Sequence, residues 1–372
     1  MKKILCFIFV LSILMTSIGC SSKNNSNSLP KDTSTGSTAT ISTGPDENGI
    51  MFPEGTPETT SITLHCPKDY NMSGQVVVAL EKGYFEAAGL DVEIVWYQNG
   101  GDIPTAMLSG GADLAFGSWI NPLQVAAYGV NTKILCNTGD PAGTLSLVAG
   151  KNSGITAVTD ITGKTVTIAN AAVVDRTFHN ICDLYNIDYD SINIVNADPS
   201  DGVAALMNGD VDAIFTWQPY CATAILTAGG TEIINGQYDY SNGETTPVSG
   251  VYIAGCTFFG TEEFVTANPN TIARLLWALA KATCDLQDDS QIDELAELTA
   301  QTIGTEPDIA ASAMRSMTYT MEINDDWVAT LKSEVPYYVG IGSLPSEIDP
   351  VPLLDMTYLD LINPGWDQLS KD

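Results

Sequence analysis

The chain has 372 residues, and its 45 acidic and 15 basic residues give a formal net charge of −30. This charge excludes nucleic-acid-binding proteins, which need a basic surface, and an acidic surface mainly keeps a protein soluble. The length allows two or three domains, and a hydrophobic content of 44% is sufficient for a core.

Residues 1–20 are predicted to be an export signal. Two lysines precede an apolar run over residues 4–15, which is too short to span a membrane as a stable helix. The small residue before Cys20 resembles the cleavage box of bacterial lipoproteins, although Ser17 stands where leucine is usual. We therefore expect Cys20 to carry a lipid. The alternative is an ordinary signal peptide with an incidental cysteine.

Residues 21–60 are rich in Ser, Thr, Asn, Gly and Pro and have almost no apolar content. Such a segment cannot bury a core, so we expect a disordered tether with a root-mean-square reach of roughly 35 Å. A tether behind a lipidated cysteine would let the folded part work just off a membrane surface.

Beyond residue 60, short apolar runs alternate with helical patterns, as in α/β proteins. The predicted strands are residues 62–66, 91–96, 114–116, 133–136, 145–149, 166–169, 192–195, 213–215, 232–234 and 250–259. Helices are predicted between them, for example at 75–81, 122–128 and 173–185. From residue 261 the pattern is helical, with predicted helices opening at 268–269 and covering 291–303, 307–317, 326–335 and 353–361.

One unit of this pattern occurs twice, at Asp102 to Trp119 and at Asp201 to Trp217. Five aligned pairs are identical, and each pair is 99 residues apart. Each copy is predicted to have its first aspartate as N-cap, then a short helix, a left-handed glycine (Gly110 or Gly209) and a buried strand. Two copies at a domain-sized distance indicate two similar α/β lobes.

Several short motifs extend this pattern: EKGYF at 81–85 with GLDV at 89–92, AMLSGGAD at 106–113, DAIFTWQPY at 212–220 and the helix opening at 268–269. Their order resembles periplasmic-type solute-binding proteins of ATP-binding-cassette (ABC) importers. It is closest to the nitrate/sulfonate/taurine group, which shares its fold with thiamine-pyrimidine-binding proteins. The resemblance covers roughly residues 61–366 and is fairly specific for the fold but weak for the ligand.

The resemblance implies an α/β, two-lobed periplasmic-binding-protein-like (type II) fold with the ligand between the lobes. We expect residues 61–150 and 257–372 to form lobe 1 and residues 151–256 to form lobe 2. The two crossing segments would lie near residues 147–156 and 247–256.

In open α/β sheets, ligands bind beyond the carboxyl ends of strands, near helix N-termini. Applied here, this rule selects loops rich in aromatic, amide and hydroxyl side chains, which suit hydrogen bonding to and stacking on a small ligand. The candidate ligand-binding residues are Tyr70, Asn71, Ser118, Trp119, Asn137, Thr138, Asn170, Arg176, Trp217, Gln218 and Tyr220. Trp119 and Trp217 could equally be packing residues, and Arg176 could equally pair with Asp175 or another acid.

The charges in these loops are Lys68, Asp69, Asp140, Asp175 and Arg176. The acidic excess slightly favours a neutral or weakly cationic ring over nitrate or a sulfonate. Helix N-termini could nevertheless hold such an anion without basic side chains.

Enzymatic signals are thin. His65 lies within a predicted strand and His179 within a predicted helix, and both are interpreted as structural. The six cysteines beyond Cys20 show no C-x-x-C spacing and are interpreted as buried thiols, so neither a metal nor a cofactor is expected.

The sequence therefore predicts an extracytoplasmic, membrane-anchored binding lipoprotein, monomeric and without catalytic residues. It would deliver a small organic solute to an ABC permease, the solute being a sulfonate-, taurine- or nitrate-type anion or a pyrimidine-like ring. Two alternatives remain open: an enzyme of the pyrimidine-synthesis type with the same fold, and a ligand sensor without transport.

Overall fold

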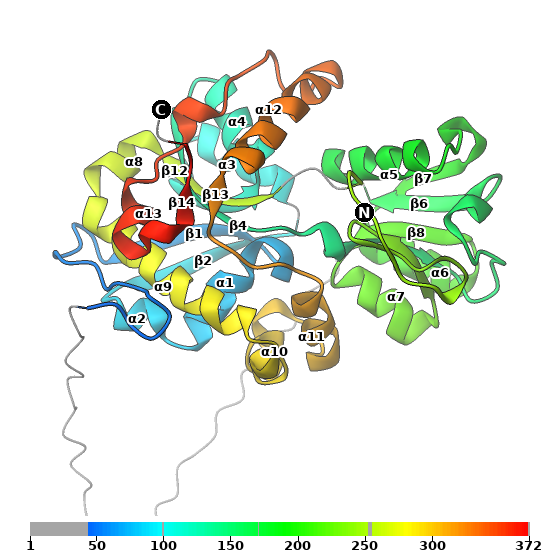
Figure 1. Cartoon of the computed structure of the whole chain (residues 1–372), viewed down its shortest axis with the longest axis horizontal. Coiled ribbons are helices and arrows are strands. Elements are labelled where there is room, and N and C mark those ends of the chain that lie inside the picture. The colour runs from blue at the N-terminus through cyan, green and yellow to red at the C-terminus, as the bar shows by residue number, and fades with distance from the viewer. Residues whose placement is uncertain (1–43, 99, 170, 252–254, 371–372) are drawn as a thin grey trace, which may run out of the picture. The chain divides into compact units, whose positions relative to one another are not determined.

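The structure, a computed structural model, describes residues 44–98, 100–169, 171–251 and 255–370. The predicted signal segment, Cys20 and Asn170 lie outside these residues. The described chain forms two mixed α/β units, each built on its own sheet (Figure 1). None of the described helices is long and apolar enough to cross a bilayer.

The first sheet has five strands in the order β2-β1-β3-β12-β4. Strand β1 runs parallel to β2 and β3, whereas β12 is antiparallel to β3 and β4. Every residue of β3 and β12 is buried, because helices cover both faces of this sheet. The strand bounds are β1 Ser61–Pro67, β2 Asp91–Tyr97, β3 Leu114–Ser118, β4 Thr132–Gly139 and β12 Cys256–Thr261.

The second sheet has seven strands in the order β11-β10-β9-β5-β8-β6-β7. Strand β6 is parallel to β7 and β8, and β5 is antiparallel to β8 and β9. The strand bounds are β5 Leu145–Ala149, β6 Thr165–Ala169, β7 Asn193–Ala197, β8 Ala213–Trp217, β9 Thr231–Asn235, β10 Tyr238–Asp239 and β11 Thr246–Pro247.

Helices of the first unit pack in two groups. Helices α1, α9, α10 and α11 cover one face of the sheet, and α3, α4 and α12 cover the other. Their bounds are α1 Tyr70–Glu81, α2 Tyr84–Ala87, α3 Ile103–Leu108, α4 Ile120–Ala127, α8 Glu262–Ala267, α9 Pro269–Gln287, α10 Ile292–Ile303, α11 Pro307–Arg315, α12 Asp325–Gly340 and α13 Thr357–Ile362. A short parallel pair, β13 Ile323–Asn324 and β14 Asp367–Gln368, adjoins them.

In the second unit, α5 packs on one face of the sheet, and α6 and α7 pack on the other. The bounds are α5 Ala172–Leu184, α6 Pro199–Asn208 and α7 Tyr220–Ala228.

The predicted boundary after residue 150 is misplaced. Strand β5 was assigned to lobe 1, but it pairs with β8 and β9 in the second sheet. The chain therefore leaves the first sheet between β4 and β5, before the expected segment at 147–156. An apolar strand buried on both faces fits the centre of either sheet, so its sequence does not reveal its partners.

The two copies of the repeat lie in different sheets, with β3 in the first and β8 in the second. Gly110 (φ 74°) and Gly209 (φ 77°) both adopt the predicted left-handed conformation. The predicted aspartate N-caps are half right. Asp102 occupies the N-cap position of α3, although its side chain makes no capping hydrogen bond, whereas Asp201 lies inside the first turn of α6. An acid is also favourable in a first turn, so its presence does not locate the cap.

The predicted tether does not extend to residue 60. Asp46 forms an ion pair with Lys281 of α9 at 2.7 Å, and Ile50 is 1% exposed. The Glu58 carboxylate accepts the backbone N–H groups of Asn270 and Thr271, in the first turn of α9. These contacts depend on single residues within a polar, proline-containing segment, which is why composition concealed them.

Candidate ligand-binding site

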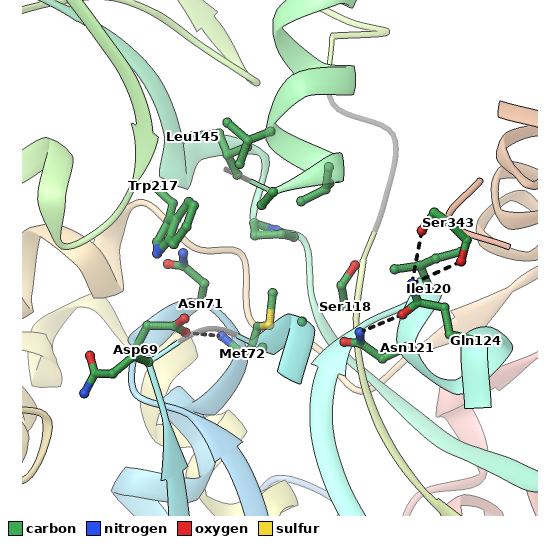
Figure 2. Close-up of a pocket in the computed structure, with 17 residues that line it drawn as sticks. Asp69, Asn71, Met72, Ser118, Ile120, Asn121, Gln124, Leu145, Trp217 and Ser343 are labelled. Atoms are coloured by element: carbon green, nitrogen blue, oxygen red, sulfur yellow. Dashed lines mark hydrogen bonds between the residues drawn. The ribbon is translucent and has the colours of Figure 1, made fainter. Parts of the chain in front are cut away.

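A cavity of about 250 Å³ is lined by segments that follow strands of both sheets (Figure 2). Its lining residues are Asp69, Asn71, Met72, Gln98, Gly100, Gly101, Ser118, Ile120, Asn121, Gln124, Pro141, Leu145, Ala171, Val173, Val174, Trp217 and Ser343. This position, beyond the carboxyl ends of β1, β3 and β8, is where open α/β sheets place ligands.

The start of α1 forms one wall. Asp69 is the N-cap of this helix, and its carboxylate accepts the backbone N–H of Met72 at 2.9 Å. Burial raises the pKa of Asp69 to about 6. The backbone hydrogen bonds from Met72 and Asn71 stabilise the charged carboxylate and lower the pKa, but their effect is smaller. The Asn71 side chain donates from Nδ2 to the carbonyl of Gln218, at 3.3 Å.

The start of α4 forms a second wall. Gln124 donates from Nε2 to the carbonyl and hydroxyl of Ser343, at 3.4 and 3.0 Å. Its Oε1 accepts from Nδ2 of Asn121 at 3.3 Å. A Cβ at Gly117 would stand 2.3 Å from the Asn121 Oδ1, so the asparagine keeps this position only beside glycine.

The second unit supplies a mostly apolar wall. Val173 and Val174 come from the first turn of α5, Leu145 from β5, and Trp217 from the end of β8. The Trp217 ring packs edge-to-face on Tyr220, with centroids 6.1 Å apart. The wall offers contact area and a ring face rather than charge.

Three buried polar atoms of lining residues have no hydrogen-bond partner within the described part of the chain: Asn71 Oδ1, Ser118 Oγ and Asn121 Oδ1. These residues are only 4%, 7% and 4% exposed. Buried polar atoms are nearly always paired in folded proteins. The Asn121 oxygen lies against Gly117, so Asn71 Oδ1 and Ser118 Oγ are the candidate contacts for a bound molecule.

Three of the predicted site residues, Asn71, Ser118 and Trp217, line the cavity. Their sequence neighbours point elsewhere. Tyr70 is fully buried, and its hydroxyl lies 3.0 Å from Thr299 Oγ1. Trp119 is also fully buried and packs edge-to-face on Tyr338.

The other predicted residues that the structure describes do not line the cavity. Asn137 accepts the backbone N–H of Gly139, and Thr138 is buried beside it. Gln218 accepts the N–H of Ala222 through Oε1. Tyr220 packs on Trp217, which lines the cavity.

Arg176 forms an ion pair with Glu334 of α12, with Nε 3.2 Å from Oε2. Its guanidinium also lies 4.6 Å from the centroid of the Tyr337 ring. The ion-pair alternative for Arg176 therefore holds, with Glu334 rather than Asp175 as the partner.

Sequence reasoning missed Met72, Asn121, Gln124 and Ser343 as lining residues, and it treated Asp69 only as a nearby charge. The three-residue spacing of Asn121 and Gln124 on one helix face was a usable signal. Nothing in the local sequence signals Ser343, because its place depends on the packing of the segment after α12.

Residues 71–291 match the protein family described as NMT1/THI5 like. The chain belongs to this family. A Bacillus subtilis (strain 168) protein provisionally named as an aliphatic sulfonates-binding protein is 24% identical over 292 residues, which are 76% of this chain and 83% of that protein.

Two solved structures show the fold of this NMT1/THI5-like chain. The alkanesulfonate-binding protein SsuA from Xanthomonas axonopodis pv. citri, bound to MOPS, matches with a TM-score of 0.65 at 16% identity, over 81% of this chain and 100% of that chain. The desulfurization enzyme DSZB matches with a TM-score of 0.60 at 17% identity, over 81% and 98%. The predicted type II periplasmic-binding-protein-like fold is confirmed.

Catalytic side chains are sparse around the cavity of this family member. Neither a histidine nor a cysteine is among its lining residues in the described ranges. His65 lies 2.8 Å from the Tyr97 hydroxyl, and His179 stacks on Tyr189. The six described cysteines are all free thiols, and five are buried, as predicted. No cluster of three or more metal-binding side chains occurs in residues 44–98, 100–169, 171–251 and 255–370.

Proposed function

We propose that the protein is an extracytoplasmic substrate-binding lipoprotein that holds a small organic solute in this cavity and delivers it to an ABC importer. The observation that carries the proposal is the cavity itself, which places unpartnered polar atoms and a tryptophan ring at the strand ends of both sheets. Family membership and the sulfonate-binding relatives support a transport role.

An enzyme is the second candidate, because DSZB shares the fold. The lining of the described cavity argues against it. Covalent or acid–base chemistry needs a nucleophile or a base within hydrogen-bond reach of the substrate. Among the described lining residues, Asp69 is the only ionisable side chain, and one of its carboxylate oxygens is already engaged as a helix cap.

A thermal-shift screen tests the proposal, using sulfonates, nitrate, pyrimidines and organic amines. A ligand that binds only the folded state adds about 2.7 kcal/mol to the free energy of unfolding when its concentration is one hundred times its Kd. The melting temperature rises accordingly. We expect one chemical class to give saturable shifts, with the compound recovered unchanged after incubation. Recovery of a converted product would overturn the binding-protein assignment in favour of the enzyme.

The membrane anchor is tested separately. We expect mass spectrometry of the native protein to show a lipidated Cys20, and we expect Cys20→Ala to release the protein from the membrane fraction. An unmodified amino terminus downstream of Cys20, with the protein free in the medium, would contradict the anchor.

A further inference from the structure

We propose that the ligand of this cavity is a small organic amine whose protonated nitrogen is held by Asp69. The proposal rests on the binding function proposed above and narrows it to one chemical class. It differs from the simplest expectation drawn from the relatives, which is a sulfonate anion.

The charge of the lining residues favours a cationic ligand. Asp69 is the only charged side chain among the described residues that line the cavity. The two nearest candidate cations point elsewhere. The Lys68 Nζ lies beside Gly304 at the end of α10, and Arg176 is paired with Glu334. A partly buried carboxylate without a counter-charge favours a cationic partner supplied by the ligand.

The other titratable groups close to Asp69 do not change this balance. Cys66, Tyr220, Cys256 and Tyr319 interact electrostatically with it, and all four are acids. Burial raises the pKa of each of these thiols and phenols, so they stay neutral near pH 7. None of these four groups therefore supplies a positive charge to Asp69 near pH 7.

The orientation of the side-chain amide groups determines which of their atoms remain without a hydrogen-bond partner. Gln124 must donate its NH₂ group to the Ser343 carbonyl, which leaves Gln124 Oε1 to accept from the NH₂ group of Asn121. The unpartnered atom of Asn121 is therefore its oxygen. The Asn71 NH₂ group is likewise committed to the Gln218 carbonyl, which leaves the Asn71 oxygen unpartnered.

The cavity is thus rich in acceptors. It offers the Asp69 carboxylate, the Asn71 amide oxygen and the Ser118 hydroxyl, and no described side chain in its lining offers a positive charge. An ammonium group has three donors and no acceptor, so it matches this set, whereas a sulfonate carries only acceptors. The apolar body of an amine would lie against Trp217, Val174 and Leu145.

One feature favours an anion instead. Helices α4 and α5 begin at the cavity without a side-chain cap, and such N-termini bind anions through backbone N–H groups. An anion held there would share the cavity with the Asp69 carboxylate. The experiment must therefore compare the two charges on one carbon skeleton.

The test is a titration of the full-length mature protein with 2-phenylethylamine, 2-phenylethanol and 2-phenylethanesulfonate, and with the corresponding butyl series. We expect the amine of at least one series to bind about tenfold more tightly than its alcohol, and the sulfonate to bind most weakly. Tightest binding by a sulfonate, or binding by neither amine, would overturn the proposal. Unchanged recovery of a bound sulfonate would still leave the binding function intact.

Asp69→Asn provides the decisive variant, since asparagine caps helices as well as aspartate does and so preserves α1. Loss of the charge should weaken amine binding by roughly thirtyfold and leave alcohol binding nearly unchanged. Asp188→Asn is the matched control, because Asp188 caps a short turn outside the cavity. Equal amine affinity in Asp69→Asn and in the parent protein would contradict the proposed contact.

Discussion

At the scale of single residues, Asp69 has two roles that conflict. Its carboxylate caps α1, which stabilises the helix, yet burial raises its pKa to about 6. The folded state therefore binds the Asp69 proton more tightly than the unfolded state does. In the ligand-free protein, the charged carboxylate lowers stability above about pH 6, and this cost disappears as the pH falls toward about 4.

The variant Asp69→Asn should therefore raise the melting temperature of the ligand-free protein near pH 7. The gain should shrink as the pH is lowered through about 6 to about 4, because the parent carboxyl becomes neutral there. Thermal unfolding followed by circular dichroism at several pH values checks this expectation. A melting temperature that is unchanged or lower near pH 7 would show that the carboxylate is well solvated.

The two repeat tryptophans should differ in their effects. Trp217 lines the cavity and is half-buried, so Trp217→Ala should weaken ligand binding by at least about fivefold with a modest loss of stability. Trp119 is fully buried in the core, so Trp119→Ala should instead lower the free energy of unfolding by about 3 to 5 kcal/mol. Urea unfolding and calorimetry separate the two effects. If the two variants were equally stable and lost binding equally, the placement of Trp217 at the cavity and Trp119 in the core would be contradicted.

At the scale of elements, helix α9 is capped by a segment far away in sequence. The Glu58 carboxylate accepts hydrogen bonds from two backbone N–H groups at the start of α9. The N-cap residue of α9, Asn268, makes no side-chain capping bond. The ordered residues after position 44 therefore stabilise α9 rather than acting as a free linker.

Removing this contact with Glu58→Ala should lower the free energy of unfolding by about 1 kcal/mol, as loss of a helix cap usually does. The matched control is Glu54→Ala, because Glu54 is exposed in the same segment. Denaturant unfolding of both variants gives the comparison. If the control loses as much stability as Glu58→Ala, the cap is not the cause.

The sequence patterns predicted most elements but not all of their neighbours. Short apolar runs located β3 and β8, and the two glycines located the turns before them. Pairing partners are set by long-range packing, so the sheet to which β5 belongs could not be read from its apolar run.

The candidate site was predictable only in part. The predicted loops supply Asn71, Ser118 and Trp217, but adjacent side chains diverge, so that Ser118 lines the cavity while Trp119 enters the core. Gly100 and Gly101 also line the cavity and lay outside every predicted loop. Hydrogen bonds between distant segments, such as Gln124 to Ser343, leave no local pattern in the sequence.

At the scale of the whole molecule, the lining of one cavity combines segments that follow strands of both sheets. We propose that these segments hold a small solute in the cavity and that the protein binds this solute without altering it. A two-sided lining explains why residues separated by a hundred or more positions, such as Asn71 and Trp217, contribute to one site.

The most direct measurement is a calorimetric titration with the best ligand of the screen, followed by mass spectrometry of the recovered compound. We predict one ligand per chain, recovered unchanged, with binding weakened in both Trp217→Ala and Asp69→Asn. A ligand converted to product, or a ligand that both variants bind as tightly as the parent protein does, would contradict this prediction.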